Sequence, residues 1–178
     1  MNGPVNRMHI TCQNCIVRSW KSEDEKTLPR HANNIKIWRN LRDRFPHPYT
    51  PADAKEFIGR MLAKDVETNF AIDVGGEAVG GVGLMLHDDV ERCSAEIGYW
   101  LSEEYWGRGI MTEALLAVVD HAFSQFQLSR IYALPFAGNA ASNKVLEKAG
   151  FALEGILRHS AIKEGVIRDQ LMYARTHG

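Results

Sequence analysis

Long apolar segments, leader-like segments and an excess of one charge are all missing from this sequence. No apolar run approaches the roughly 18 to 20 residues that a membrane-spanning helix needs, and the first ten residues, MNGPVNRMHI, hold no apolar leader core. The chain has 21 lysine and arginine residues against 22 aspartate and glutamate residues, without a basic block that would meet nucleic acid. We therefore expect a cytoplasmic protein with neither a membrane nor a nucleic-acid partner.

Cysteine is also scarce, with only Cys12, Cys15 and Cys93 in the chain. An odd count without framework spacing excludes a disulfide scaffold. Cys12 and Cys15 form a C-x-x-C, which occurs in redox pairs and as half of a zinc site. The surrounding segment HITCQNCIVRSW alternates as a strand does, and residues three apart in a strand point to opposite faces. No second pair completes a tetrahedral site, so we expect no metal.

The 178 residues are enough for one domain with its own core, and we expect a single domain over residues 1–178 with a core at about 10–175. The mixture of hairpins with a β–α–β crossover is typical of an α/β (α+β) domain. In the first half of the chain the patterns predict a strand over 10–20, two short helices, a helix from about Ala52 to Lys64 capped by Thr50, and a hairpin turning at Gly75-Gly76. In the second half they predict a strand in SAEIGYWLS, a helix after Gly109, a strand in SRIYALPF and a helix ending at Gly150. A closing hairpin turns near Glu164-Gly165.

The stretch YWGRGIMTEAL places a bare turn, Gly107-Arg108-Gly109, directly before the most apolar helix. The first turn of a helix has amide groups without intrahelical partners, and the helix dipole favours an anion there. Glycine lets a ligand approach the backbone, and Arg108 adds a cation. The turn is therefore either a phosphate cradle or a plain tight connection. It is not a P-loop, because no G-K-[ST] follows, and it lacks the third glycine of a dinucleotide motif.

Two segments, AEIGYWLSEEYWGRGIMTEAL and NAASNKVLEKAGFALEGILR, carry a family resemblance. Together they resemble the GNAT superfamily of acetyl-CoA-dependent N-acetyltransferases, and within it the RimJ/RimL branch, named for acetylation of ribosomal-protein N-termini. The resemblance runs from CIVRSW to DQLMYA, nearly the whole chain. It implies the GNAT fold: a central mixed, mostly antiparallel sheet of about seven strands, flanked by helices and splayed between the strands at 94–102 and 130–136.

The resemblance also implies where acetyl-CoA binds. The family's phosphate motif, [QR]-x-x-G-x-[GA], falls on residues 106–111, where Trp106 replaces Gln or Arg and Met111 replaces Gly or Ala. Because backbone amides do the binding in this family, the departures are tolerable. Asn139 matches an asparagine that contacts the pantetheine arm, although it is an equally natural helix N-cap. The implied cofactor residues are Gly107, Arg108, Gly109, Ile110, Met111 and Thr112 for the pyrophosphate, and the backbone of Tyr99, Trp100 and Leu101 for pantetheine.

Acetyl transfer needs a group that takes a proton from the amine and a group that protonates the leaving thiolate. Glu96, in the strand before the glycine turn, is the candidate base; the alternative is a cross-strand pair with a lysine or arginine. Ser142, one helical turn after Asn139, is the candidate partner of the sulfur; the alternative is a hydroxyl that caps backbone. Many relatives use a tyrosine seven residues after the asparagine, but Leu146 stands there.

The sequence thus predicts an acetyl-CoA-dependent N-acetyltransferase that works by direct attack of a primary amine in a ternary complex, as a monomer or homodimer. The acceptor is either a protein N-terminus or a small-molecule amine. The loop FPHPYT is the candidate wall of its pocket, with His47, Tyr49 and Arg158 as candidate contacts. The alternative function is a catalytically silent CoA-binding or regulatory module of the same fold.

Overall fold

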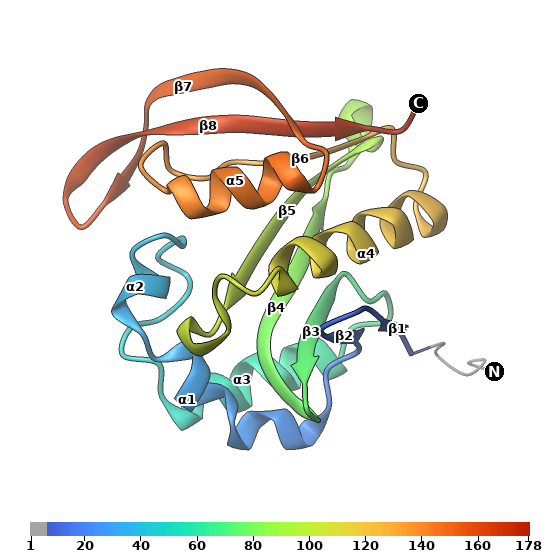
Figure 1. Ribbon diagram of the computed structural model, residues 1–178, viewed down its shortest axis with the longest axis vertical. Coiled ribbons are helices and arrows are strands. Elements are labelled where there is room, and N and C mark those ends of the chain that lie inside the picture. The colour runs from blue at the N-terminus through green and yellow to red at the C-terminus, as the bar shows by residue number, and fades with distance from the viewer. Residues whose placement is uncertain (1–6) are drawn as a thin grey trace.

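A computed structural model describes residues 7–178 of the chain (Figure 1). The expectation that no leader is present rests partly on residues 1–6, which lie outside the described residues. The elements in order are β1 (His9–Thr11), β2 (Ile16–Arg18), η1 (Ser22–Lys26), α1 (Leu28–Ala32), α2 (Ile35–Trp38), α3 (Pro51–Leu62), β3 (Asn69–Val74), β4 (Glu77–Leu86), η2 (Asp89–Glu91), β5 (Ser94–Leu101), η3 (Glu103–Tyr105), α4 (Ile110–Gln125), β6 (Arg130–Ala133), α5 (Ala140–Lys148), β7 (Ala152–Lys163) and β8 (Val166–Thr176).

The sheet is mixed and mostly antiparallel, as predicted, but it has eight strands in the order β1-β2-β3-β4-β5-β6-β8-β7. The extra strand arises because the segment expected as one strand over 10–20 folds as a hairpin. The register pairs Thr11 with Ile16, so Cys12 and Cys15 face each other at the turn, where the Cys12 amide donates to the Cys15 carbonyl at 2.9 Å. The expectation that these cysteines point to opposite faces of a strand is wrong.

Helices cover both faces of the sheet, and the side chains of β3 point alternately to the helices on one face and to those on the other. Phe70 and Ile72 point into a core formed with α4, whereas Ala71 between them packs on the opposite face with residues of α1 and α3. This is the period-two alternation of a strand buried on both sides. Figure 1 shows α4 crossing the sheet and the long β7–β8 hairpin beside β6. Within residues 7–178, no helix is long and apolar enough to cross a membrane.

The sheet opens between β5 and β6, as the resemblance implied. These strands are parallel neighbours only at Ser94–Glu96 and Arg130–Tyr132. Beyond Glu96, β5 continues to Leu101 along β4, while β6 ends at Ala133 rather than near residue 136. Among residues 7–178, no strand therefore lies along one edge of β5 from Ile97 onward.

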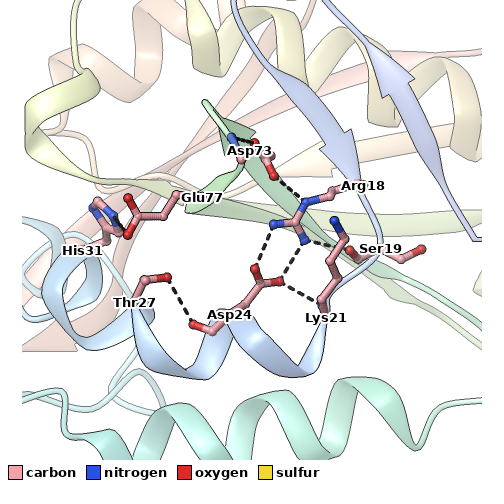
Figure 2. Close-up of polar contacts among 9 residues, drawn as sticks. Arg18, Ser19, Lys21, Asp24, Thr27, His31, Asp73 and Glu77 are labelled. Atoms are coloured by element: carbon pink, nitrogen blue, oxygen red, sulfur yellow. Dashed lines mark hydrogen bonds and ion pairs between the residues drawn. The ribbon is translucent and has the colours of Figure 1, made fainter.

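A buried ion cluster fixes the helices under the far end of the sheet. The Arg18 guanidinium donates two hydrogen bonds of 2.8 Å to the Asp24 carboxylate and one of 2.6 Å to Asp73 (Figure 2). Asp73 also accepts the amide of Gly76 in the β3–β4 turn at 2.7 Å. All three charged groups are buried, but each is paired, so the desolvation cost is offset by short charge-assisted bonds. The cluster joins β2, η1 and β3.

Several local signals are confirmed at their predicted positions. Thr50 caps α3 and forms a capping box with Asp53, with Pro51 as the first helical residue. Gly75 and Gly76 turn the β3–β4 hairpin with φ of 66° and 93°, and Gly150 ends α5 with φ of 81°. These are positions where backbone geometry decides the residue type.

Candidate active site

Strand β5 presents different residues to the two sides of the sheet. Ile97 and Leu101 are buried in the core with α4, and Tyr99 packs against the same core. Glu96, Gly98 and Trp100 alternate with them and face the side of α1 to α3, where Trp100 packs on the Phe45 ring with centroids 5.7 Å apart. A molecule in the opening beside β5 is thus accessible from both faces of the sheet.

The glycine turn lies directly after this open strand. Gly107 and Gly109 have φ of 75° and 78°, and Gly109 is the N-cap of α4. The first bond into the helix runs from the Glu113 amide to the Gly109 carbonyl at 3.1 Å, so the amides of residues 110–112 precede any intrahelical partner. A Cβ at Gly107 would meet no heavy atom within 4 Å. The turn therefore leaves room and donors for an anion.

A continuous groove of about 1510 Å³ passes through the opening. It contains several of the predicted cofactor residues: Tyr99, Trp100, Leu101, Gly107, Met111 and Asn139. Both candidate catalytic residues, Glu96 and Ser142, also line it. Arg108, Gly109, Ile110 and Thr112 lie outside its lining, and the Arg108 guanidinium lies over the Tyr105 ring, 5.3 Å from its centroid. The structure thus brings together the catalytic candidates and the predicted pantetheine strand.

Ser142 meets a tyrosine that sequence reasoning had not assigned to it. The Tyr99 and Ser142 hydroxyl oxygens lie 2.6 Å apart. Burial raises the pKa of Tyr99 to about 12, although the Ser142 bond acts in the opposite direction. Asn139 caps α5, since its side-chain oxygen accepts the Ser142 amide at 3.2 Å. A neutral two-hydroxyl chain therefore faces the groove.

Glu96 forms an ion pair with Arg42. The sequence offered a cross-strand pair with a lysine or arginine as the alternative role of Glu96. The observed partner is an arginine, but it lies in the segment after α2 and not on a neighbouring strand. The Glu96 side chain is 15% exposed and that of Arg42 is 48% exposed. Glu96 is thus a largely enclosed carboxylate whose partner is half-exposed, so that the Arg42 guanidinium stays hydrated when it leaves the pair.

The wall opposite β5 is formed by the segment after α2. Phe45, Pro46 and Tyr49 line the groove, as predicted for part of FPHPYT. His47 instead stacks on Trp38, with centroids 5.5 Å apart, and Arg158 is exposed on β7; both lie outside the groove lining.

Lys163 anchors this wall from β7. Its buried ammonium donates to Asp43 at 2.7 Å and lies 3.8 Å from the Trp38 ring centroid. No local pattern in the sequence signalled the pair, because 120 positions separate the partners.

Trp106 explains one departure from the family's phosphate motif. Its indole nitrogen donates to the Leu101 carbonyl at 2.8 Å, and so it fastens the end of β5 to the glycine turn. The side chain at this position ties the turn to the strand. The backbone amides of residues 110–112, which follow, are not involved in this bond.

A mixed sheet that opens beside a glycine turn, with a groove passing through the opening, defines the acyl-CoA N-acyltransferase class of fold. The chain belongs to the GNAT family: the family model described as "Acetyltransferase (GNAT) domain" matches residues 14–152. Its relatives include ribosomal-protein acetyltransferases, and its structural neighbours include RimL and RimJ.

Individual relatives agree with this placement. The chain is 41% identical over 115 residues to "Probable N-acetyltransferase YjcK" of Bacillus subtilis (strain 168), which is 64% of each protein. It is 35% identical over 161 residues to "Uncharacterized N-acetyltransferase p20" of Bacillus licheniformis, covering 89% of this chain and 90% of p20. It thus spans less than two thirds of YjcK and nearly all of p20.

Solved structures share the fold. RimL, a ribosomal L7/L12 alpha-N-protein acetyltransferase in complex with coenzyme A, superposes with a TM-score of 0.83 at 23% identity, over 95% of this chain and 98% of that one. RimJ of Mycobacterium smegmatis, in complex with CoA-disulfide, superposes with a TM-score of 0.78 at 27% identity, over 91% and 81%.

Proposed function

We propose that this protein is an acetyl-CoA-dependent N-acetyltransferase that acts on a primary amine by direct attack in a ternary complex. One observation carries the proposal: the opening beside β5 is reached from both faces of the sheet, with Ser142 and Tyr99 on one side and Glu96 on the other. Two substrates bound from opposite faces would meet there without a covalent enzyme intermediate. Family membership and the CoA-bound neighbours support the choice of co-substrate.

The residues present fit acetyl-CoA. The amides at the start of α4 suit the pyrophosphate, and the open edge of β5 can pair with the amides of pantetheine as a strand pairs with a peptide. Because Trp106 already donates to the Leu101 carbonyl, the Tyr99 and Trp100 backbone is the better part of this edge. When bound, acetyl-CoA supplies an activated acetyl thioester.

Glu96 is the proposed base. An amine with a pKa of about 8 to 10 is protonated near neutral pH and cannot attack until it loses a proton. Glu96 lies on the acceptor side of β5, and an incoming ammonium can replace Arg42 as its partner. The carboxylate then binds the amine and accepts its proton, directly or through water.

Ser142 is the proposed proton donor on the opposite side. Its hydroxyl can protonate the departing thiolate and recover a proton from the hydroxyl of Tyr99, 2.6 Å away. The tyrosinate left behind then takes a proton from water in the groove. Because the pKa of Tyr99 is raised, its hydroxyl is protonated throughout the neutral range before each turnover.

For the acceptor, the charges of the groove favour a peptide or protein N-terminal amine over a polyamine. Three of the carboxylates along the lining are engaged: Glu96 pairs with Arg42, Glu56 with Arg60 at 3.6 Å, and Asp53 caps α3; Asp65 is the fourth. Basic side chains are more numerous along the same lining: Lys36, Arg39, Arg42, Arg44, Arg60 and Lys64. Lys36 and Arg39 pair with Glu103 and Glu164 outside the lining, so the positive excess is modest. This excess disfavours a polyamine relative to a neutral or acidic chain. A spermidine N(1)-acetyltransferase of Escherichia coli is among the relatives, at 26% identity, and so spermidine is the appropriate competitor.

The test combines acetyl-CoA with a panel of amines and detects the product by mass. A short peptide of neutral and acidic residues with a free N-terminus should gain one acetyl group, whereas the same peptide blocked at its N-terminus should not. Spermidine should be a poor substrate. Glu96→Gln should lower kcat by about 10²- to 10⁴-fold, and the loss should shrink as pH rises and more amine is neutral.

Stability provides the control, because Gln keeps the shape of the Glu96 side chain and Arg42, 48% exposed, stays hydrated when it loses its partner. Glu96→Gln should therefore melt close to the unmodified protein and bind CoA with the same affinity. If the protein binds CoA but acetylates no amine in the panel, it is a silent CoA-binding module. If Glu96→Gln keeps the full rate across the pH range, Glu96 is not the base.

A further inference from the structure

The hairpin turn between β1 and β2 lies against the first turn of α4. Its two cysteines, Cys12 and Cys15, occupy opposite positions at the hairpin end and so point to the same side. Glu113, one turn into α4, lies on that same side. One sulfur from each cysteine and a Glu113 carboxylate oxygen all lie within 4.8 Å of one another.

We propose that Cys12, Cys15 and Glu113 form a binding site for one Zn²⁺ ion, with water as the fourth ligand. Two thiolates and a carboxylate are ligands that zinc takes in proteins. Bonds of about 2.3 Å to sulfur and about 2.0–2.2 Å to oxygen place tetrahedral ligand atoms about 3.5–3.8 Å apart, so the present spacing needs only small side-chain movements. The proposal is independent of the proposed acetyltransferase activity.

The surroundings orient the carboxylate as a metal ligand requires. The Asn14 backbone amide donates to Glu113 Oε2 at 2.9 Å, and the Asn14 side-chain amide donates to Glu113 Oε1. These bonds hold the carboxylate beside the turn while each oxygen keeps a further lone pair for a cation. Asn14 is exposed, whereas Cys15 is only 6% exposed, so the site has a solvent-facing entrance and a buried floor.

Metal binding at this turn is coupled to proton release. Zinc binds the thiolate form of cysteine, so it must displace the two thiol protons, and its affinity falls as pH falls.

The site lies beside the helix turn whose amides, under the proposed function, would hold the CoA pyrophosphate. Glu113 is in that turn, and its Oε1 lies 4.0 Å from a Cβ built at Gly109. Zinc brings two positive charges and displaces two protons, so the net charge of the cluster stays the same. We therefore expect zinc to change CoA affinity little.

The test uses full-length protein purified with a phosphine reductant and no chelator. Titration with Zn²⁺ should show one ion per chain and a rise in Tm, with about two protons released per ion in weak buffer. Co²⁺ should give a thiolate-to-cobalt charge-transfer band. Cys12→Ser and Cys15→Ser should each lose the band, and Asn14→Ala should weaken zinc by about 10- to 100-fold.

Cys93→Ser is the matched control, since Cys93 is the exposed cysteine remote from this turn, and it should bind zinc as the unmodified protein does. Absence of stoichiometric zinc in the folded protein overturns the site, and so does zinc binding that survives loss of both cysteines. A mass two hydrogens below the dithiol form, despite reductant, would identify a disulfide instead. Because zinc is measured without CoA, failure here is separate from failure of the acetyltransferase proposal.

Discussion

The Tyr99 hydroxyl lies 2.6 Å from that of Ser142, and the two residues come from elements on either side of the opening in the sheet. Tyr99 is on β5 and Ser142 is in the first turn of α5. The bond therefore joins β5 to α5 across the opening.

If these hydroxyls form one proton relay, their removal should not be additive. Ser142→Ala and Tyr99→Phe should each lower kcat by about 10²-fold or more, and the double variant should be little worse than the more damaged single variant. Single-turnover rates with saturating substrates measure the effect. Losses that multiply would mean that the two hydroxyls act separately, and an unchanged rate in both single variants would mean that neither acts.

Replacement of Gly109 separates binding from backbone strain. Gly109→Ala places a side chain at φ of 78° in the turn before α4, and Gly75→Ala does the same at φ of 66° in the β3–β4 turn. Each should cost roughly 1–2 kcal/mol of stability. Only Gly109→Ala should also weaken CoA, by about tenfold or more, which corresponds to about 1.4 kcal/mol. Calorimetric titration with CoA that gives equal affinities for both variants would refute the pyrophosphate assignment.

The Lys163–Asp43 pair predicts an unequal response to loss of its two partners. Lys163 is buried and Asp43 is 75% exposed. Within the described part of the chain, Asp43→Ala leaves the buried ammonium with the Trp38 ring alone, whereas Lys163→Met removes the charge and keeps an apolar stem. Asp43→Ala should therefore lower Tm more than Lys163→Met does, by scanning calorimetry. The reverse order would indicate that Lys163 is adequately solvated without Asp43.

Buried tyrosines predict a loss of stability in alkaline solution. Burial, aided by the Asp53 charge, raises the pKa of Tyr49 to about 12, and burial raises that of Tyr99 to about 12. In the unfolded chain both titrate near about 10. Between about pH 10 and pH 12 the folded state holds protons that the unfolded state has lost, so the free energy of unfolding falls as pH rises.

Below about pH 10 this contribution is complete. Urea unfolding at stepped pH should show a shallower decline for Tyr49→Phe. Tyrosinate absorbance, followed in parallel, should rise together with unfolding. If the free energy of unfolding of the variant falls equally steeply with pH, groups other than Tyr49 control the loss of stability in alkaline solution.

The sequence predicts helix starts and turns correctly where the backbone conformation restricts a position to one or a few residue types. Thr50 with Pro51, Gly75 with Gly76, and the glycine before α4 are local signals, and each appears in the structure where it was predicted. The opening between β5 and β6 followed from family resemblance rather than from pattern.

The errors and omissions concern contacts that local patterns do not encode. Gln13-Asn14 carries no glycine, so the local pattern predicts a continuous strand with the two cysteines on opposite faces, whereas the chain turns there between β1 and β2. Arg42 and Glu96 are 54 positions apart, and Tyr99 and Ser142 are 43 apart. Such pairs depend on how the elements pack, which a linear pattern does not specify.

The short seam between β5 and β6 also determines the shape of the opening. Its last register pair is Glu96 with Tyr132, so the two strands diverge from that point like the arms of a V. Glu96 stands at the vertex, and the glycine turn lies beyond the far end of β5. The opening is therefore narrowest at Glu96 and wider toward the glycine turn. A long molecule that lies in it has one end at the turn and the other at this carboxylate.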